Sequence, residues 1–275
     1  MNQPVYIFDV DGVINDIHTY RADTRVLGQI SKLLHDGCCV ALNTGRGYAW
    51  VEQNVVDYLR KKPGAASDLS RLFVSVEMGG LTVAFANGVE RHERTAFSLL
   101  PEQIERVKRL YEQHKIAGVQ HWYAGKLSMA TIDKPAGASP ARFLVEGKAL
   151  IAALEKEFAG EHVKILHNPD AIDVTTPEAG KWAGAQLIYD WLQRAPGATP
   201  THFICFGDNA SDYEMARFFA GQGHRVDFVF TGETLGQVTH DPGIIFTKTA
   251  AFYSDGTYAF LKNQTAAGQP RHLQR

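Results

Sequence analysis

The chain has 275 residues, of which 45% are hydrophobic and 21% charged, as in a globular protein with one large domain or a core domain carrying a smaller one. Its formal net charge of −2 at pH 7 excludes the broad basic surface that attracts nucleic acid or anionic lipid. No apolar run reaches the roughly 20 residues that span a bilayer, and residues 1–11 lack the pattern of a signal peptide. We therefore expect a cytoplasmic protein whose partner is a small metabolite, with no nucleic acid and no membrane involved; its oligomeric state stays open.

Short runs rich in β-branched and aromatic residues predict buried parallel strands. They lie at Val5–Val10, Cys38–Asn43, Leu72–Val76, His202–Phe206, Val226–Phe230 and Ile244–Thr247. Helical patterns separate several of them, at Thr24–His35, Trp50–Lys61 and Trp182–Arg194. This alternation favours an α/β fold with a doubly wound parallel sheet and helices on both faces.

The middle of the chain has a different pattern, after turn signals at Gly79-Gly80 and Asn87-Gly88. The periodicity predicts helices at Pro101–Lys115 and Arg142–Phe158 and strands at Leu127–Asp133, His162–Leu166 and Ala171–Thr175. We expect an α+β insert at residues 99–176, so that residues 1–98 and 177–275 form one core. Residues 263–275 lack apolar periodicity and predict a frayed tail.

The three cysteines, Cys38, Cys39 and Cys205, are an odd number. Cys38 and Cys39 are adjacent, so in a strand their side chains point to opposite faces. We expect all three to be reduced core residues rather than metal ligands or redox groups.

Two carboxylates follow the first predicted strand, Asp9 and Asp11, and Gly12 comes directly after them. Strand alternation turns both carboxylates to one side, and glycine allows a sharp bend. In open α/β sheets, ligands bind beyond the carboxyl ends of the strands. The second strand ends similarly at Thr44-Gly45, where a hydroxyl and backbone N–H groups suit an anion, although taken alone such a pair is more often simply a turn.

The strand at 202–206 is followed by Gly207, Asp208 and Asn209, with Asp212 four residues after Asp208. Carboxylate oxygens at these positions suit Mg²⁺, whereas the structural alternative is a helix cap. Lys181 precedes the helix at 182–194, where the helix dipole disfavours a cation. A bound phosphate and neighbouring carboxylates would account for this lysine; otherwise it is a solvated surface residue.

In chain order these motifs resemble the four motifs of the haloacid dehalogenase (HAD) superfamily of phosphotransferases. They are Asp9-Val10-Asp11-Gly12, Thr44-Gly45-Arg46, Lys181 and Gly207-Asp208-Asn209-Ala210-Ser211-Asp212. The resemblance covers essentially the whole core and implies a Rossmann-like fold and a phosphoric monoester hydrolase. Val13 stands where many relatives have threonine, which removes no catalytic group.

The resemblance also implies a role for each residue. Asp9 is the nucleophile, forming an aspartyl-phosphate, and Asp11 is the acid and then the base. The implied phosphate-binding residues are Thr44, Gly45, Lys181 and Asn209. The implied Mg²⁺ ligands are Asp9, Asp208, Asp212 and either Asp11 or, as the better candidate at that position, the main-chain carbonyl of Val10. Mg²⁺ is the expected cofactor because the carboxylates alone would repel a phosphate dianion.

The insert resembles the type 2 cap, of subtype C2B, found in sucrose, trehalose and mannosylglycerate phosphatases, phosphomannomutases and Cof-type hydrolases. A sugar phosphate is therefore the expected substrate. Possible contacts in the insert are Trp122, Tyr123, Lys126, Lys134, Arg142 and His167, each of which is also explained as an ordinary core or surface residue. Two other functions stay open: a phosphomutase of the phosphomannomutase type, and a catalytically silent phosphometabolite-binding protein.

Overall fold

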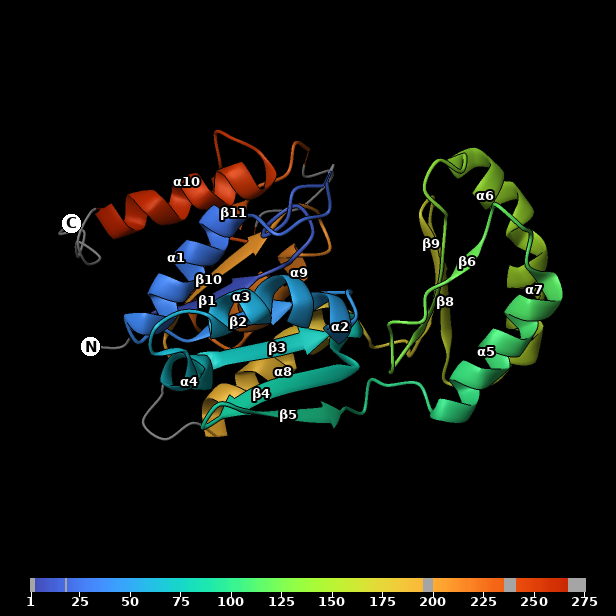
Figure 1. Ribbon diagram of the computed structural model, residues 1–275, viewed down its shortest axis with the longest axis horizontal. Coiled ribbons are helices and arrows are strands. Elements are labelled where there is room, and N and C mark those ends of the chain that lie inside the picture. The colour runs from blue at the N-terminus through green and yellow to red at the C-terminus, as the bar shows by residue number, and fades with distance from the viewer. Residues whose placement is uncertain (1–2, 18, 195–199, 235–240, 267–275) are drawn as a thin grey trace.

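The computed structural model describes residues 3–17, 19–194, 200–234 and 241–266. It contains an eight-stranded sheet and a separate four-stranded sheet. Figure 1 shows the second sheet and its helices beside the first, joined to it through extended segments. No helix within these ranges is long and apolar enough to cross a membrane.

The eight-stranded sheet has the order β12-β11-β10-β1-β2-β3-β4-β5. Its strands are β1 (Val5–Phe8), β2 (Val40–Asn43), β3 (Leu72–Val76), β4 (Leu81–Ala86), β5 (Val89–Arg94), β10 (His202–Gly207), β11 (Arg225–Phe230) and β12 (Ile244–Lys248). All neighbours are parallel except the pairs β3–β4 and β4–β5. This confirms the α/β fold with a doubly wound, largely parallel sheet.

Helices cover both faces of this sheet, since alternate residues of its buried strands enter two separate apolar clusters. Phe8 packs with one cluster, beneath α1 (Thr24–His35), α2 (Tyr48–Val51), α3 (Asp57–Arg60) and α10 (Tyr253–Ala266). Ile7 packs with the other, beneath α8 (Lys181–Arg194) and α9 (Tyr213–Gly221). A short helix α4 (Ala65–Asp68) and the one-turn segments η2 (Leu69–Arg71) and η3 (Glu77–Gly79) flank β3.

Several details differ from the sequence expectations. The helix expected at 50–61 begins at Tyr48 and contains a π-helical segment, η1 (Glu52–Val56). The hairpin β4–β5 was not predicted because charged residues fill β5; its turn places Asn87 and Gly88 at positive φ. The frayed tail was wrong for residues 263–266, which belong to α10, and its remainder, 267–275, lies outside the described residues.

The second sheet and its helices lie between Pro101 and Thr175 and are called the insert below. The sheet is antiparallel, in the order β6-β7-β9-β8. Its elements are α5 (Pro101–His114), β6 (His121–Trp122), β7 (Ala130–Asp133), α6 (Pro140–Glu146), α7 (Lys148–Glu157), β8 (Lys164–His167) and β9 (Ala171–Thr175). The helix expected at 142–158 is therefore two helices, divided at Gly147, and β6 was not predicted.

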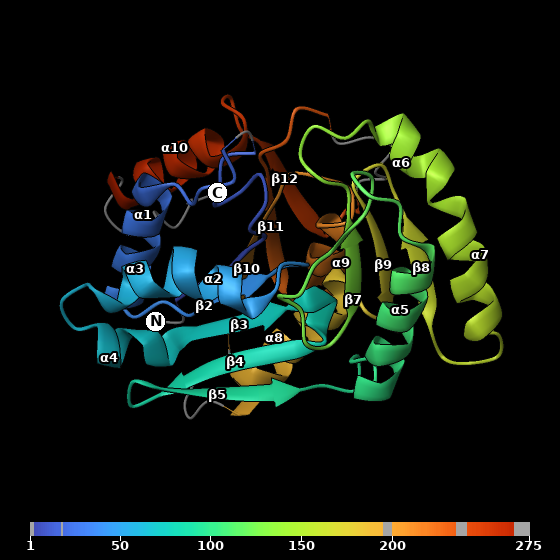
Figure 2. The same cartoon turned by 45° about the vertical axis from the view of Figure 1, so that its right-hand side comes forward.

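The helices of the insert cover one face of its sheet. Ile132 and Ile172 are fully buried in the apolar cluster on that face, together with Leu150 of α7. Figure 2 shows the sheet of the insert between these helices and the core, so the other face of the sheet is turned toward the core. That face carries the alternate residues of the same strands, among them Thr131 and Asp173.

The three cysteines are free, and Cys38 and Cys205 are buried while Cys39 is half-buried. Cys38 packs in the cluster beneath α1, and Cys39 packs against the cluster on the opposite face. Their positions are those of core residues, as the sequence predicts.

Candidate active site

Three strands bring the motif residues to one edge of the core sheet. The strands β10, β1 and β2 are adjacent and parallel, so their carboxyl ends lie side by side. Asp9 follows β1, Thr44 follows β2 and Asp208 follows β10. Lys181 is the first residue of α8, which packs over β2 and β3.

Lys181 joins the first and fourth motifs through two ion pairs. Its Nζ lies 2.5 Å from Oδ1 of Asp9 and 2.7 Å from Oδ1 of Asp212. Asp9 is 5% exposed and Asp212 is fully buried, so these charges interact with little solvent screening. Lys181 thus faces carboxylates, which accounts for a cation at a helix N-terminus.

Asn43, at the end of β2, fixes the start of α8. Its Nδ2 donates to the carbonyl oxygen of Lys181 at 2.8 Å, and Nζ of Lys181 donates to the carbonyl oxygen of Asn43 at 2.7 Å. A Cβ atom at Gly184 would lie 2.0 Å from Oδ1 of Asn43, so only glycine allows α8 to approach this closely. Sequence reasoning missed Asn43, although a polar residue at the end of a buried strand, directly before Thr44, is a signal of a role at the site.

The loop after β10 is built around Asp212. Its Oδ2 accepts the N–H groups of Asp208 and Asn209, each at 3.1 Å. A Cβ at Gly207 would lie 2.2 Å from Cβ of Asp212, so glycine is required there. Asn209 is exposed; it donates to Oδ1 of Asp208 and accepts from Ser211.

Asp11 pairs with Arg46, whereas the ion pairs of Lys181 are with Asp9 and Asp212. Nε of Arg46 lies 3.0 and 2.9 Å from the two carboxylate oxygens, and Nη2 lies 2.5 Å from Oδ1. Asn15 donates to the same Oδ1 at 2.7 Å, and the guanidinium stacks on Trp50, 4.4 Å from the ring centroid. Sequence reasoning gave Arg46 no role of its own, although it stands in the second motif.

Thr44 and Gly45 lie beside this pair. Thr44 is 1% exposed, and its hydroxyl accepts the N–H of Arg46 at 3.1 Å. The hydroxyl therefore holds the turn after β2, and the expected phosphate contact of these two residues stays a prediction.

Burial and neighbouring charges shift the pKa values of Asp9, Asp208 and Lys181. Burial, together with the charges of Asp212 and Asp11, raises the pKa of Asp9 well above its usual range, although Lys181 opposes this. Burial and the charge of Asp212 raise the pKa of Asp208 to about 7. Burial alone would lower the pKa of Lys181, but Asp212 and Asp9 outweigh it and raise that pKa. The pKa values of both aspartates and of the lysine are raised, so the site disfavours further negative charge and favours a bound cation.

Three of these carboxylates are placed to hold a cation. One oxygen each of Asp9, Asp208 and Asp212 lies within 4.8 Å of the others. Hard oxygen ligands of this kind fit Mg²⁺, and a dication would offset the excess negative charge. Asp11 is outside this cluster because its carboxylate pairs with Arg46. The main-chain oxygen of Val10, the other candidate from the sequence, accepts the N–H groups of Val13, Ile14 and Asn15 at 3.3, 2.9 and 3.0 Å, so it is engaged in the turn after β1 and its role as a ligand stays a prediction.

The face of the insert that is turned toward the core carries a second polar cluster. Nζ of Lys126 donates to Oγ1 of Thr131 at 2.7 Å, and that hydroxyl donates to Oδ1 of Asp173 at 2.5 Å. Lys126 and Asp173 are 3.6 Å apart, with side chains only 10% and 9% exposed. Burial raises the pKa of Asp133 on the same face, with Asp173 adding to the effect and Lys126 opposing it. Burial raises the pKa of Tyr123, and the charge of Arg46 in the core opposes this.

The other candidates in the insert have structural partners elsewhere. Trp122 contacts the ring of Tyr111, and His167 contacts that of Phe143, both on the helix-covered face. Lys134 lies 3.8 Å from Asp170, and Arg142 pairs with Glu146 along α6. Among the residues proposed from sequence, Tyr123 and Lys126 lie nearest the catalytic edge: Arg46 affects the pKa of Tyr123, and a Cβ atom at Gly47 would lie 3.5 Å from Cγ of Lys126. Asp173 and Thr131 were missed because they belong to strands far apart in the chain.

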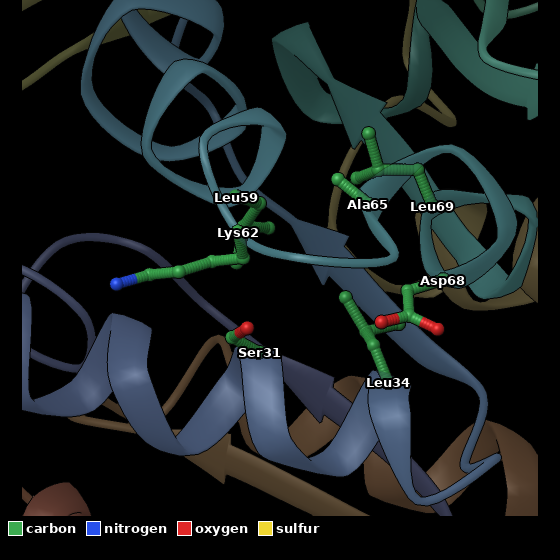
Figure 3. Close-up of a pocket in the computed structure, with 7 residues that line it drawn as sticks. All are labelled: Ser31, Leu34, Leu59, Lys62, Ala65, Asp68 and Leu69. Carbon is green, nitrogen blue, oxygen red and sulfur yellow. The ribbon is translucent and has the colours of Figure 1, made fainter.

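A shallow pocket elsewhere in the core contains none of these residues (Figure 3). It lies where the second half of α1 meets α3 and α4, and its lining comprises Ser31, Leu34, Leu59, Lys62, Ala65, Asp68 and Leu69. Asp68 is already paired with Arg71 and His35. Since α1 ends at the start of β2, this pocket lies at the edge of the sheet opposite the motif residues, and we assign it no function.

No protein-family model matches the sequence, and no curated protein sequence matches it significantly. Solved structures do match along nearly the full length. The C-terminal domain of trehalose-6-phosphate phosphatase from C. albicans has 14% identity and a TM-score of 0.67, covering 98% of this chain and 94% of that one. A haloacid dehalogenase-like hydrolase from Bacteroides thetaiotaomicron has 13% identity and a TM-score of 0.64, covering 95% and 99%.

The sucrose-phosphatase from Synechocystis sp. PCC6803, solved with sucrose and phosphate, has 13% identity and a TM-score of 0.54, covering 97% of this chain and 98% of that one. Each match spans both the core and the insert, so the two parts occur together in these proteins. The chain therefore has the fold of the haloacid dehalogenase-like hydrolases.

Proposed function

We propose that this protein is a Mg²⁺-dependent phosphatase of the HAD superfamily that hydrolyses a small sugar phosphate through an aspartyl-phosphate on Asp9. The observation that supports it most is the meeting of Asp9, Asp208, Asp212 and Lys181 at one edge of the sheet. Nucleophile, cation ligands and a phosphate-binding cation are the parts that phosphoryl transfer requires.

Asp9, Asp208 and Asp212 would hold Mg²⁺. When bound, the ion supplies positive charge that stabilises the transferring phosphoryl oxygens. Lys181 would neutralise other phosphate oxygens from the side of α8. Thr44, the N–H of Gly45 and Asn209 would complete the phosphate site.

In the first step a carboxylate oxygen of Asp9 forms a bond to phosphorus while the bond to the leaving oxygen breaks, and Asp11 gives that oxygen a proton. In the second step Asp11 takes a proton from water, whose oxygen attacks phosphorus and releases the carboxylate of Asp9. Arg46 and Asn15 hydrogen-bond the carboxylate of Asp11, so they hold this side chain in one orientation before substrate arrives.

Lys126, Asp133 and Asp173 would bind the leaving group. Their face offers both donors and acceptors, and one lysine lies beside two carboxylates. This suits neutral hydroxyl groups and disfavours a leaving group with its own negative charge. Trehalose-6-phosphate phosphatase and sucrose-phosphatase, which share the fold, support a sugar phosphate as the substrate class.

The test is phosphate release from a panel of sugar, nucleotide and short-acid phosphates with Mg²⁺. We expect the highest kcat/KM for a sugar monophosphate. Interconversion of sugar phosphate isomers without phosphate release would instead identify a phosphomutase. Ligand-dependent stabilisation with no release from any compound would identify a binding protein.

A further inference from the structure

We propose that Glu77, a residue of the core, is a positioning residue that holds the loop 123–129 of the insert over the catalytic edge. This inference rests on the proposed function, because the loop carries Tyr123 and Lys126 toward the leaving group. Figure 2 shows the segment between β6 and β7 extending from the insert to the core beside α2.

Glu77 makes its contacts to the insert through a single carboxylate oxygen. Oε2 accepts the N–H of Leu127 at 2.8 Å, the N–H of Ser128 at 2.6 Å and the hydroxyl of Ser128 at 2.7 Å. Glu77 is 1% exposed, and its Oε1 is buried with no hydrogen-bond partner within the described ranges. No lysine or arginine of the described residues pairs with this carboxylate. A buried, unpaired charge of this kind is costly unless its hydrogen bonds serve a purpose.

The backbone at Glu77 is also unusual. Glu77 has φ 55° and the next residue, Met78, has φ 58°, both in the left-handed region that side chains rarely adopt. Strained backbone of this kind persists where the surrounding structure fixes it, and it occurs preferentially at functional sites. At this strained position the Glu77 side chain reaches the insert loop, where it bonds Leu127 and Ser128.

The same turn is bonded to two parts of the catalytic edge. The N–H of Glu77 donates to the carbonyl of Arg46 at 3.0 Å, and that of Met78 donates to the carbonyl of Thr44 at 3.2 Å. The carbonyl of Met78 accepts the N–H of Gly180, the residue before Lys181, at 2.8 Å. One short segment therefore connects the second motif, the start of α8 and the insert loop.

The loop touches the core at a second point, Gly47. A Cβ atom there would lie 2.2 Å from the carbonyl oxygen of Gly125, a backbone atom that cannot move alone. Gly47 has φ −73°, which any residue tolerates, so this contact rather than the backbone requires glycine. An alanine at 47 would push the loop away from the core without altering Glu77.

The inference is tested with Glu77→Gln, which keeps size and one acceptor but removes the charge that strengthens the three bonds. Two substrates are compared: the best sugar phosphate of the panel and p-nitrophenyl phosphate, whose leaving group offers no hydroxyls to Lys126. We expect kcat/KM for the sugar phosphate to fall about 30-fold, through KM and kcat together, and that for p-nitrophenyl phosphate to change less than about 3-fold. An equal loss with both substrates, or no loss with either, would overturn the proposal.

Glu90→Gln is the matched control. Glu90 is another largely buried core carboxylate, paired with Arg60, Tyr48 and His92, and among the described residues it makes no hydrogen bond or ion pair to the insert. Glu90→Gln is expected to lower the stability of the protein while leaving the ratio of kcat/KM for the sugar phosphate to kcat/KM for p-nitrophenyl phosphate unchanged. Gly47→Ala is expected to lower that ratio as Glu77→Gln does, and the double variant should be no worse than the more impaired single variant.

Hydrogen exchange gives a readout independent of activity. The amides of Leu127 and Ser128 should exchange faster in Glu77→Gln than in wild type, while those of β7 stay protected. If wild type releases no phosphate from any substrate, the proposed function fails, and this exchange experiment still decides whether Glu77 holds the loop. Unchanged protection at these two amides would contradict the positioning role.

Discussion

Lys181 in the core and Lys126 in the insert are both half-buried lysines beside aspartates, with side chains 14% and 10% exposed. Lys181 contacts Asp9 and Asp212 at 2.5 and 2.7 Å, and these two belong to the cluster with a third carboxylate, Asp208. Lys126 lies 3.6 Å from Asp173, and the hydroxyl of Thr131 lies between them. The core cluster keeps an excess of negative charge suited to a dication, whereas the insert cluster alternates donors and acceptors suited to neutral hydroxyls.

Under the proposed function, this difference assigns chemistry to the core and selectivity to the insert. Changes in the core cluster are therefore expected to reduce turnover of every phosphate ester. Changes in the insert are expected to act only on substrates whose leaving group reaches it.

The largest effect is expected from Asp9→Asn. The amide cannot attack phosphorus, so turnover should fall by about 10⁴-fold or more with all substrates. Phosphate release measures this, and circular dichroism shows whether the variant is folded. Turnover within a factor of ten of wild type would exclude Asp9 as the nucleophile.

Metal removal is expected to have the next largest effect. Without a dication the carboxylates repel the phosphate, so EDTA should lower turnover by roughly 10³-fold, and excess Mg²⁺ should restore it. Mg²⁺ should also raise the melting temperature of wild type more than that of Asp208→Asn. Full activity in metal-free buffer would refute the metal requirement.

Arg46→Lys is expected to have a moderate effect. Lysine keeps the charge but loses the bidentate geometry that orients Asp11, so kcat should fall about 10-fold with every substrate. Steady-state kinetics on a sugar phosphate and on p-nitrophenyl phosphate check this. A loss confined to the sugar phosphate would move Arg46 into leaving-group recognition.

Lys126→Met tests the insert side of the comparison. Removing one charged hydrogen-bond donor should raise KM for the sugar phosphate about 10-fold and leave p-nitrophenyl phosphate unaffected. Lys134→Met is the matched control, since Lys134 pairs with Asp170 at 3.8 Å outside the polar cluster. If both variants behave alike, Lys126 has no special role.

The smallest effect concerns stability and pH. Folding raises the pKa of Asp208 from 3.8 to about 7, so the folded state binds the proton more tightly than the unfolded state does. This contribution is present below about pH 4 and is lost as the pH rises through about 7. In EDTA, the melting temperature of wild type should therefore fall over this window by several degrees relative to Asp208→Asn. Parallel pH profiles for the two proteins would show that Asp208 is not perturbed.

The core could be predicted from the sequence more fully than the insert, for a physical reason. Buried parallel strands are continuous apolar runs, and the residues that follow them are local in sequence, so Asp9, Thr44 and Asp208 stand out from the pattern of residues alone. Parallel strands then bring their carboxyl ends to one edge. The ion pair of Asp11 with Arg46 depends on side-chain rotamers and could not be read from spacing.

The polar face of the insert is assembled from a loop and two strands that are distant in sequence, so no motif marks it. Adjacent residues of a strand face opposite sides of the sheet, so an error of one residue in the register reverses the prediction. Trp122 packs on the helix-covered side, whereas the pKa of Tyr123 is affected by Arg46 of the core. The role of Glu77 could not be predicted from the sequence either, because its carboxylate accepts three hydrogen bonds from residues about 50 positions away.

Trapping the aspartyl-phosphate tests the central claim most directly. Asp11→Asn is mixed with p-nitrophenyl phosphate, whose leaving group needs no acid, and the mixture is treated with borohydride, which reduces an acyl phosphate to an alcohol. Without the base of the second step, the intermediate should accumulate, and mass spectrometry should find homoserine at position 9. Turnover at the wild-type rate, or reduction at a different carboxylate, would contradict the account.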